Sequence, residues 1–431
     1  MKINKVAITG TKGKTTVANV FAEVLQKLDV EKVLLVNTDG HFVNGEQKST
    51  TSDSIATWGM RPTVSPGRYL FEFLHNEQNE GDEFAAVLEA SLSSGTTIGT
   101  GYPVVSVAAF LNVFDDHIGS SARTELKNRK DLAKLKSFIY TRMKKGSYAV
   151  CNADDPLVVK SLKVIPKNKE VQILYFGLQK NIARLLKKKD TKGVLTVIDG
   201  EIVYITEEST AVVMAVKDVS WTFDGMYEPS VYNLLAIIAI AVGYYEGIIH
   251  ERLAEALKDI HPDSRSGRLV RFACKKNITL IADYAHEGES LREIALLSKK
   301  IVKTNGRVLG VVRLAHNRSD EHIEKVAKVL ALEYDHLVVY DKIDGHWNDP
   351  DPEKQRNKKF PKIVGRTSDV LHTAIQKYGG SSQRIVREDE AIAKAAEVAQ
   401  DGDVVISIVG DDIDRSIGFL KESFEAEILY T

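Results

Sequence analysis

Short apolar runs alternate with amphipathic stretches through the first half of the chain. Apolar residues recur at Val17, Val20, Phe21, Val24 and Leu25, a spacing typical of a helix with one face in a core. Strand and helix patterns in alternation predict a parallel sheet flanked by helices. The apolar runs that predict its strands lie at residues 5–9, 33–37, 85–89, 104–113, 148–152 and 171–176.

The pattern changes between residues 194 and 217, where β-rich runs are shorter. The pair Asp199-Gly200 interrupts them, and such a pair predicts the tight turn of a hairpin added to the sheet. A buried helix is expected near residues 231–246. The segment HPDSRSGR at 261–268 is polar and rich in turn formers, so we predict a linker there.

A second alternation follows this linker and predicts a second, smaller α/β domain. We therefore predict two domains, residues 1–263 and residues 264–431. The strands of the second domain are expected near 278–283, 307–313, 336–340 and 403–409, and its helices near 290–303, 320–332 and 389–399.

Composition narrows the function classes. The 58 Lys and Arg residues nearly balance the 59 Asp and Glu residues among 431, so no global field favours nucleic acid or an anionic membrane. Two cysteines are too few for a disulfide framework, which favours a reducing interior. No apolar run approaches the roughly 20 residues of a membrane helix, and no signal peptide is visible. We expect a cytoplasmic protein without nucleic-acid or membrane partners; no oligomeric state follows from the sequence.

The segment between the first strand and the first helix is a candidate phosphate-binding loop. Its two glycines allow a tight curl beside the positive end of the helix dipole. Lys14 is suited to reach the β- and γ-phosphates of a nucleotide, and Thr15 to bind Mg²⁺. Ile8 replaces the first glycine of the general pattern, and an ordinary basic turn is the alternative interpretation. The loop residues are Gly10, Thr11, Lys12, Gly13, Lys14, Thr15 and Thr16.

Glu89 and His117 end two later strand-like runs. Ligands gather beyond the carboxyl ends of parallel strands, so both side chains are expected near the loop. A carboxylate beside Thr15 suits Mg²⁺, which prefers oxygen ligands. Alternatively, Glu89 is a solvent-facing strand end and His117 a turn histidine with ordinary hydrogen bonds.

Several segments of the chain resemble motifs of the Mur ligase family. They occur in the family's order, and the matches span nearly the whole length of the chain. The resemblance implies a P-loop parallel-sheet ATPase domain followed by a Rossmann-like α/β domain. The matching segments are GTKGKTT (10–16), Glu89, NVFDDHIG (112–119), DLAKLKSFI (131–139), CNADDP (151–156), YNLLAI (232–237), SGR (266–268) and IADYAH (281–286).

Within the family, the chain is most similar to the Mur-ligase-like half of cyanophycin synthetase. RSDEHI (318–323) also resembles that group. Two departures concern the substrates: ASLSSGTTIGTG (90–101) lacks the group's arginines, and Glu287-Gly288 replaces an asparagine-proline pair. Murein ligases place a sugar-nucleotide-binding domain before the phosphate loop. We expect this chain to lack that domain and the ATP-grasp half of cyanophycin synthetase.

The resemblance assigns further roles, each with a plainer alternative. Lys136 aligns with a lysine that many members carbamylate, which would make it a metal ligand with His117; otherwise it is a helix-surface lysine. Asn233 would contact adenine or cap a helix. Asp283 would contact the ribose, and Arg268 would bind phosphates or be a linker charge. His286 would orient its loop or cap it.

The resemblance implies an ATP- and Mg²⁺-dependent amide ligase that forms ADP through an acyl phosphate. Its substrates would be small molecules, an amino acid or amine and an amino-acid or peptide carboxylate. A nucleotidase or switch without ligation, and a nucleotide-binding scaffold, are the alternatives. Arg61, Arg68 and Arg313 are candidates to neutralise the substrate carboxylate, or else are solvated surface arginines.

Overall fold

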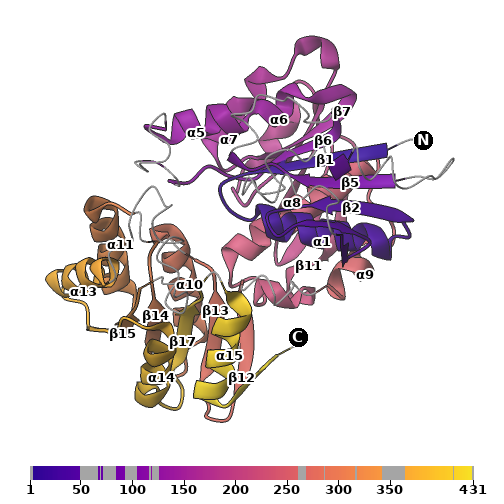
Figure 1. The fold of residues 1–431 in the computed structure, drawn as a ribbon. Helices are drawn as coiled ribbons and strands as arrows, with labels where there is room; N and C mark the ends of the chain where they lie inside the picture. The colour runs from indigo at the N-terminus through magenta and orange to yellow at the C-terminus, as the bar shows by residue number, and fades with distance from the viewer. Residues whose placement is uncertain are drawn as a thin grey trace. The chain divides into compact units, whose positions relative to one another are not determined.

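The structure is a computed structural model in which the chain divides into two compact units (Figure 1). Unit 1 comprises Met1–Ile118 and Glu125–Ile260, and unit 2 comprises Gly119–Thr124 and His261–Thr431. The predicted domain boundary after residue 263 lies outside the described residues. Those described are 3–48, 67, 69–70, 84–92, 104–115, 118, 126–260, 268–285, 287–315, 318–341, 365–410 and 412–429.

The described part of unit 1 contains one eleven-stranded sheet, in the order β11-β10-β9-β8-β7-β6-β1-β5-β2-β3-β4. The strands from β9 to β2 in this order are parallel to their neighbours, and antiparallel hairpins extend both edges. The parallel strands are β1 (Ile3–Thr9), β2 (Lys32–Val36), β5 (Phe84–Glu89), β6 (Val105–Phe110), β7 (Met143–Asn152), β8 (Gln172–Phe176) and β9 (Thr191–Ile198). The hairpin strands are β3 (His41–Val43), β4 (Glu46–Gln47), β10 (Glu201–Ile205) and β11 (Thr210–Ala215).

Alternate residues of β1 belong to two cores on opposite faces of this sheet. Val6 and Ile8 pack in the core that contains helices α1 (Lys14–Lys27), α8 (Glu228–Tyr244) and α9 (Leu253–Lys258). Ala7 points to the other core, with helices α5 (Arg129–Lys136), α6 (Phe138–Thr141) and α7 (Pro156–Ser161). Short 3-10 turns complete the unit: η2 (Leu162–Val164), η3 (Lys167–Lys169), η4 (Ile182–Lys187), η5 (Val216–Asp218) and η6 (Ser220–Thr222).

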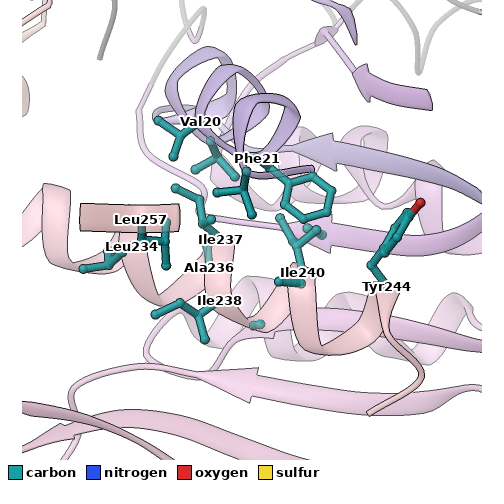
Figure 2. Packing of buried hydrophobic residues seen from close by; sticks show 14 of the residues in the cluster. Val20, Phe21, Leu234, Ala236, Ile237, Ile238, Ile240, Tyr244 and Leu257 are labelled. Carbon is teal, nitrogen blue, oxygen red and sulfur yellow. The ribbon is translucent and has the colours of Figure 1, made fainter. Parts of the chain in front are cut away.

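Helix α8 is the centre of the first core. Figure 2 shows Val20 and Phe21 of α1 beside Ile237 and Ile240 of α8. Every residue from 234 to 242 is buried, because α8 packs against both the sheet and α1. A helix enclosed in this way is apolar all round, which explains the uninterrupted run in the sequence.

The predicted hairpin at Asp199-Gly200 is confirmed. The two residues join β9 to β10 with φ angles of 50° and 82°, the left-handed pair that a two-residue turn of this kind requires. A second hairpin, β3–β4, turns at Asn44-Gly45 with φ angles of 50° and 81° and was not predicted.

The described part of unit 2 contains a seven-stranded sheet in the order β16-β15-β14-β17-β13-β12-β18. The first five strands in this order are parallel, and β12 and β18 add an antiparallel edge. The strands are β12 (Val270–Cys274), β13 (Thr279–Asp283), β14 (Val308–Val312), β15 (His336–Val339), β16 (Ser382–Arg384), β17 (Val404–Ile408) and β18 (Ala426–Ile428).

Helices cover both faces of this second sheet. Helices α14 (Glu388–Val398) and α15 (Ile413–Phe424) share a core with Leu280 and Val405. Helices α10 (Gly288–Ile301), α11 (Asp320–Glu333) and α13 (Arg366–Lys377) form the layer on the other face, where Ile406 is buried. The predicted α/β class is therefore confirmed. Among the described residues, no helix has the length and apolarity needed to span a bilayer.

Candidate nucleotide site

The candidate phosphate loop of unit 1 joins β1 to α1, as predicted. Asn112, which follows β6, shapes its first half: its Oδ1 accepts hydrogen bonds from the Thr11 and Lys12 amides at 3.0 and 2.9 Å. Its Nδ2 donates to the Lys12 carbonyl at 3.1 Å. These two loop amides are therefore engaged by the protein, and the N–H groups that open α1 are the better candidates to bind an anion.

Gly10 and Gly13 serve different purposes in this loop. A Cβ on Gly10 would lie 3.0 Å from the Leu111 Cβ, so the glycine allows close packing. Gly13 has a φ of 81° and caps α1, a left-handed conformation that favours glycine. The Lys14 Nζ donates to the Thr11 carbonyl at 3.0 Å, which holds the ammonium group over the loop.

The Glu89 carboxylate lies directly beside the start of α1. The Thr15 hydroxyl donates to its Oε2 at 3.0 Å, and the Thr38 hydroxyl donates to its Oε1 at 3.0 Å. The Thr38 amide donates to Oε2 at 3.3 Å. Glu89 is only 1% exposed, so its interpretation as a solvent-facing strand end is wrong. Strand pairing explains why Thr15, Thr38 and Glu89 lie together. Strands β1 and β2 both flank β5, and the carboxyl ends of the three strands meet at one edge of the sheet.

Asn233 also belongs to this site. A Cβ on Gly13 would lie 2.3 Å from the Asn233 Oδ1, so the asparagine side chain lies against the loop backbone. Asn233 is in the second turn of α8, which begins at Glu228, so its interpretation as a helix cap is wrong. A substitution at Gly13 would be disfavoured twice, by its φ and by this contact.

The remaining predicted residues of unit 1 differ in how far the structure describes them. Lys136 is the last residue of α5 and is 4% exposed, so it is not a helix-surface lysine. His117, Arg61 and Arg68 lie outside the described residues.

In unit 2, Arg268 precedes β12 and Asp283 ends β13, so the two positions lie at the same end of this antiparallel strand pair. Asp283 Oδ2 accepts from the Leu269 amide at 3.0 Å, and its Oδ1 accepts from Ala285 at 2.7 Å. The Arg268 guanidinium lies 5.9 Å from the centre of the Tyr284 ring, so this residue is packed and is more than a linker charge. His286 lies outside the described residues.

Arg313 approaches the same ring from β14. Its guanidinium carbon lies 5.1 Å from the ring centre of Tyr284, and its Nε donates to the Val409 carbonyl at 3.1 Å. The residue is 1% exposed, so its interpretation as a solvated surface arginine is wrong. The carboxyl ends of β13, β14 and β17 thus gather two cationic side chains around one aromatic ring.

Comparison with known proteins places both units in one family. A family model described as the Mur ligase middle domain matches residues 8–241, more than half of the chain. The chain belongs to the Mur ligase family. A second model, the Mur ligase glutamate ligase domain, matches residues 267–408. The family predicted from the sequence motifs is confirmed.

Two relatives and one solved structure indicate the breadth of this similarity. Cyanophycin synthetase from Geminocystis herdmanii is 24% identical over 426 residues, 98% of this Mur ligase chain but 44% of that protein. The UDP-N-acetylmuramoyl-L-alanyl-D-glutamate–2,6-diaminopimelate ligase of Parabacteroides distasonis is 24% identical over 428 residues, 98% of this chain and 76% of the relative. The structure of E. coli FolC with DHPP and ADP has a TM-score of 0.62 at 13% identity, covering 97% of this chain and 89% of FolC.

The chain thus spans less than half the length of the cyanophycin synthetases that it matches. The two relatives carry the names of a synthetase and a ligase, which agrees with the ligase predicted from the sequence. The FolC similarity, at this identity, supports the fold, a phosphate-loop domain followed by a Rossmann-like domain.

Thr38 and Asn112 were not predicted as site residues, although both contact the site. A signal was available, since each is a polar residue within two positions of the carboxyl end of a predicted strand. That position marks the ligand edge of a parallel sheet.

Proposed function

We propose that this Mur ligase is an ATP-dependent amide ligase that forms ADP. It would join the amine of one small molecule, such as an amino acid, to the carboxylate of an amino acid or peptide. The observation that carries the proposal is the attachment of the Gly13-Lys14-Thr15 segment to a buried carboxylate, Glu89, by a hydrogen bond of 3.0 Å. The names of the relatives support the same reaction class.

The proposed reaction has two displacements. A carboxylate oxygen attacks the γ-phosphorus of ATP, the bond to the bridging oxygen breaks, and ADP leaves. The amine nitrogen then attacks the acyl carbon, inorganic phosphate leaves with the bonding electrons, and the amine proton passes to solvent. Phosphoryl transfer requires little covalent chemistry from the protein. The protein therefore acts mainly by positioning the reactants and by stabilising the charge on the transferred group. The hydrogen bond from Lys14 to the Thr11 carbonyl supports such a role for this lysine.

The residues around Glu89 fit a Mg²⁺ ion. In the part of the chain that the structure describes, the Glu89 carboxylate accepts hydrogen bonds from two hydroxyl groups and one backbone amide, and it contacts no cationic side chain. A buried carboxylate is costly without a positive partner. Thr15 and Glu89 would hold the ion, which neutralises phosphate charge when bound and takes its other ligands from water and phosphate. His117 and Lys136 are proposed to hold a second ion.

The test is amide formation with ATP, Mg²⁺ and pairs drawn from a panel of amino acids and short peptides. We expect ADP release that depends on both substrates, together with a product whose mass equals their sum less one water. Lys14→Ala should lower turnover by roughly 10² to 10⁴ without unfolding the protein, because a charge-assisted contact to the transferred group is lost. AMP as product would contradict the acyl-phosphate route. ATP hydrolysis that no amino acid stimulates would favour a nucleotidase.

We further propose that Lys136 is carbamylated in the active enzyme, which would convert its ammonium into an oxygen ligand. Its burial at the end of α5 supports a fixed position. Lys136→Ala should abolish ligation, and a short-chain carboxylic acid should restore part of it. Lys134→Ala, which changes an exposed lysine two residues away in the same helix, is the matched control and should retain activity. Full activity of Lys136→Ala would end this proposal.

A further inference from the structure

Asp154 connects three elements of unit 1 beside the nucleotide site. It follows β7, and its Oδ2 accepts hydrogen bonds from the Leu178 amide, after β8, at 2.6 Å and from the Tyr232 hydroxyl of α8 at 2.7 Å. The carboxylate lies so close to Gly177 that a Cβ there would be 2.7 Å from Oδ1. Gly177 therefore accommodates Asp154, and the ends of β7 and β8 are fixed to the start of α8.

Helix α8 has few other means of setting its position along its own axis. Its N-cap, Tyr227, makes no side-chain capping hydrogen bond, and Pro229 in the first turn offers no amide. Most of the other contacts that the structure describes for this helix are apolar, and apolar packing is non-directional. The directional Tyr232–Asp154 hydrogen bond therefore defines where the first turns of α8 lie.

That position matters because the next residue is Asn233. Its Oδ1 lies against Gly13, where there is no space for even one additional carbon atom. A small shift of α8 would either press Asn233 into the phosphate loop or open a gap beside it. The loop conformation is thus coupled to the hydrogen bond at Tyr232.

We propose that Tyr232 and Asp154 are a positioning pair that holds Asn233 against the phosphate loop and thereby sets the affinity for ATP. This inference rests on the proposed function only in taking the loop as the ATP site. Burial and the hydrogen bond to Asp154 raise the pKa of Tyr232, so its hydroxyl is protonated and acts as a donor at neutral pH.

The experiment is calorimetric titration of the full chain with MgATP, which needs no knowledge of the amide substrates. Tyr232→Phe should bind ATP about 5- to 30-fold more weakly, less than the full effect of a lost charge-assisted hydrogen bond, because the lost bond positions Asn233 and does not contact ATP itself. Asp154→Asn keeps an acceptor oxygen without the charge, so a smaller loss is expected. The matched control is Tyr204→Phe, which removes a hydroxyl that donates to the Gly247 carbonyl at 3.4 Å, just beyond the other end of α8, and should leave affinity unchanged.

A double-mutant cycle separates positioning from general stability. If the pair acts through Asn233, Tyr232→Phe should have little further effect on ATP affinity in an Asn233→Ala background. Wild-type affinity in Tyr232→Phe, or full additivity with Asn233→Ala, would overturn the inference while leaving the ligase proposal intact. Absence of MgATP binding by the wild-type chain would overturn both.

Discussion

Glu89 illustrates at the scale of one residue why burial changes an interpretation. As a strand-terminal glutamate it could have faced water, and only the pairing of β5 with β1 and β2 places it between Thr15 and Thr38. The sequence predicted the type of ligand and its strand end. It could not predict that Thr38, 51 positions away, would share the carboxylate, because that contact depends on strand order.

The Glu89 carboxylate leads to a prediction about metal dependence. Glu89→Gln should raise the Mg²⁺ concentration needed for half-maximal ATP turnover by about tenfold or more, because an amide oxygen is a weaker ligand than a carboxylate. Thr38→Val should cause a smaller increase, since it removes a hydrogen bond that orients the carboxylate. A Mg²⁺ titration of each variant provides the measurement. Glu46→Gln, at a side chain that is 78% exposed, is the control, and an unchanged midpoint in Glu89→Gln would exclude a metal role.

Contacts between segments that are distant in the sequence could not be predicted from local patterns either. Asn233 and Gly13 are about 220 positions apart, and no local pattern in the sequence indicates that one restricts the other. The family resemblance identified both residues as nucleotide-site candidates. Their direct packing, and the role of Asp154 beside them, required the structure.

At the scale of elements, buried strands were the most predictable feature. Runs such as 5–9 and 403–409 are largely apolar because helices cover both faces of each sheet, and they correspond to β1 and β17. Short edge strands were missed. The strand β16 (Ser382–Arg384) has two exposed residues among three, so it carries no apolar signal. Helices α13 and α15 were missed as well, although each has a buried stripe.

The turn before β17 shows how one carboxylate joins two strands. Asp403 accepts from the Arg307 amide and from its Nη2, both at 2.7 Å, and from the Gln400 amide at 2.9 Å. Burial raises the pKa of Asp403, but the bonds and charge of Arg307 outweigh it, so the net pKa lies below the usual carboxyl value. The ionised form therefore stabilises the folded state of unit 2.

A lowered pKa has a definite sign in the pH dependence of stability. The contribution of Asp403 should be complete above the ordinary carboxyl pKa of about 3.9 and should be lost as pH falls through the lower folded value. We expect Asp403→Asn to be less stable than wild type at pH 7 and the difference to shrink below about pH 4. Urea unfolding at several pH values measures this. Asp401→Asn, at an exposed neighbour, is the control, and a pH-independent difference would refute the ionic explanation.

At the scale of the whole molecule, each unit has its own sheet and its own buried cores. The loop, Glu89 and Asn233 all belong to unit 1, whereas Arg268 and Asp283 belong to unit 2. The residues that the family resemblance assigns to the nucleotide are therefore divided between the two units.

This division predicts the behaviour of a fragment comprising residues 1–260. The fragment should unfold cooperatively, because the first core is complete within it, and it should bind MgATP within about tenfold of the full chain. It should not support ATP turnover, because Arg268 and Asp283 are absent. Thermal unfolding, calorimetry and ADP release test the three statements, with Arg268→Ala in the full chain as the matched comparison. A folded fragment that fails to bind MgATP would show that unit 2 is required for binding. A fragment with full turnover would contradict the nucleotide roles that the resemblance implies for Arg268 and Asp283.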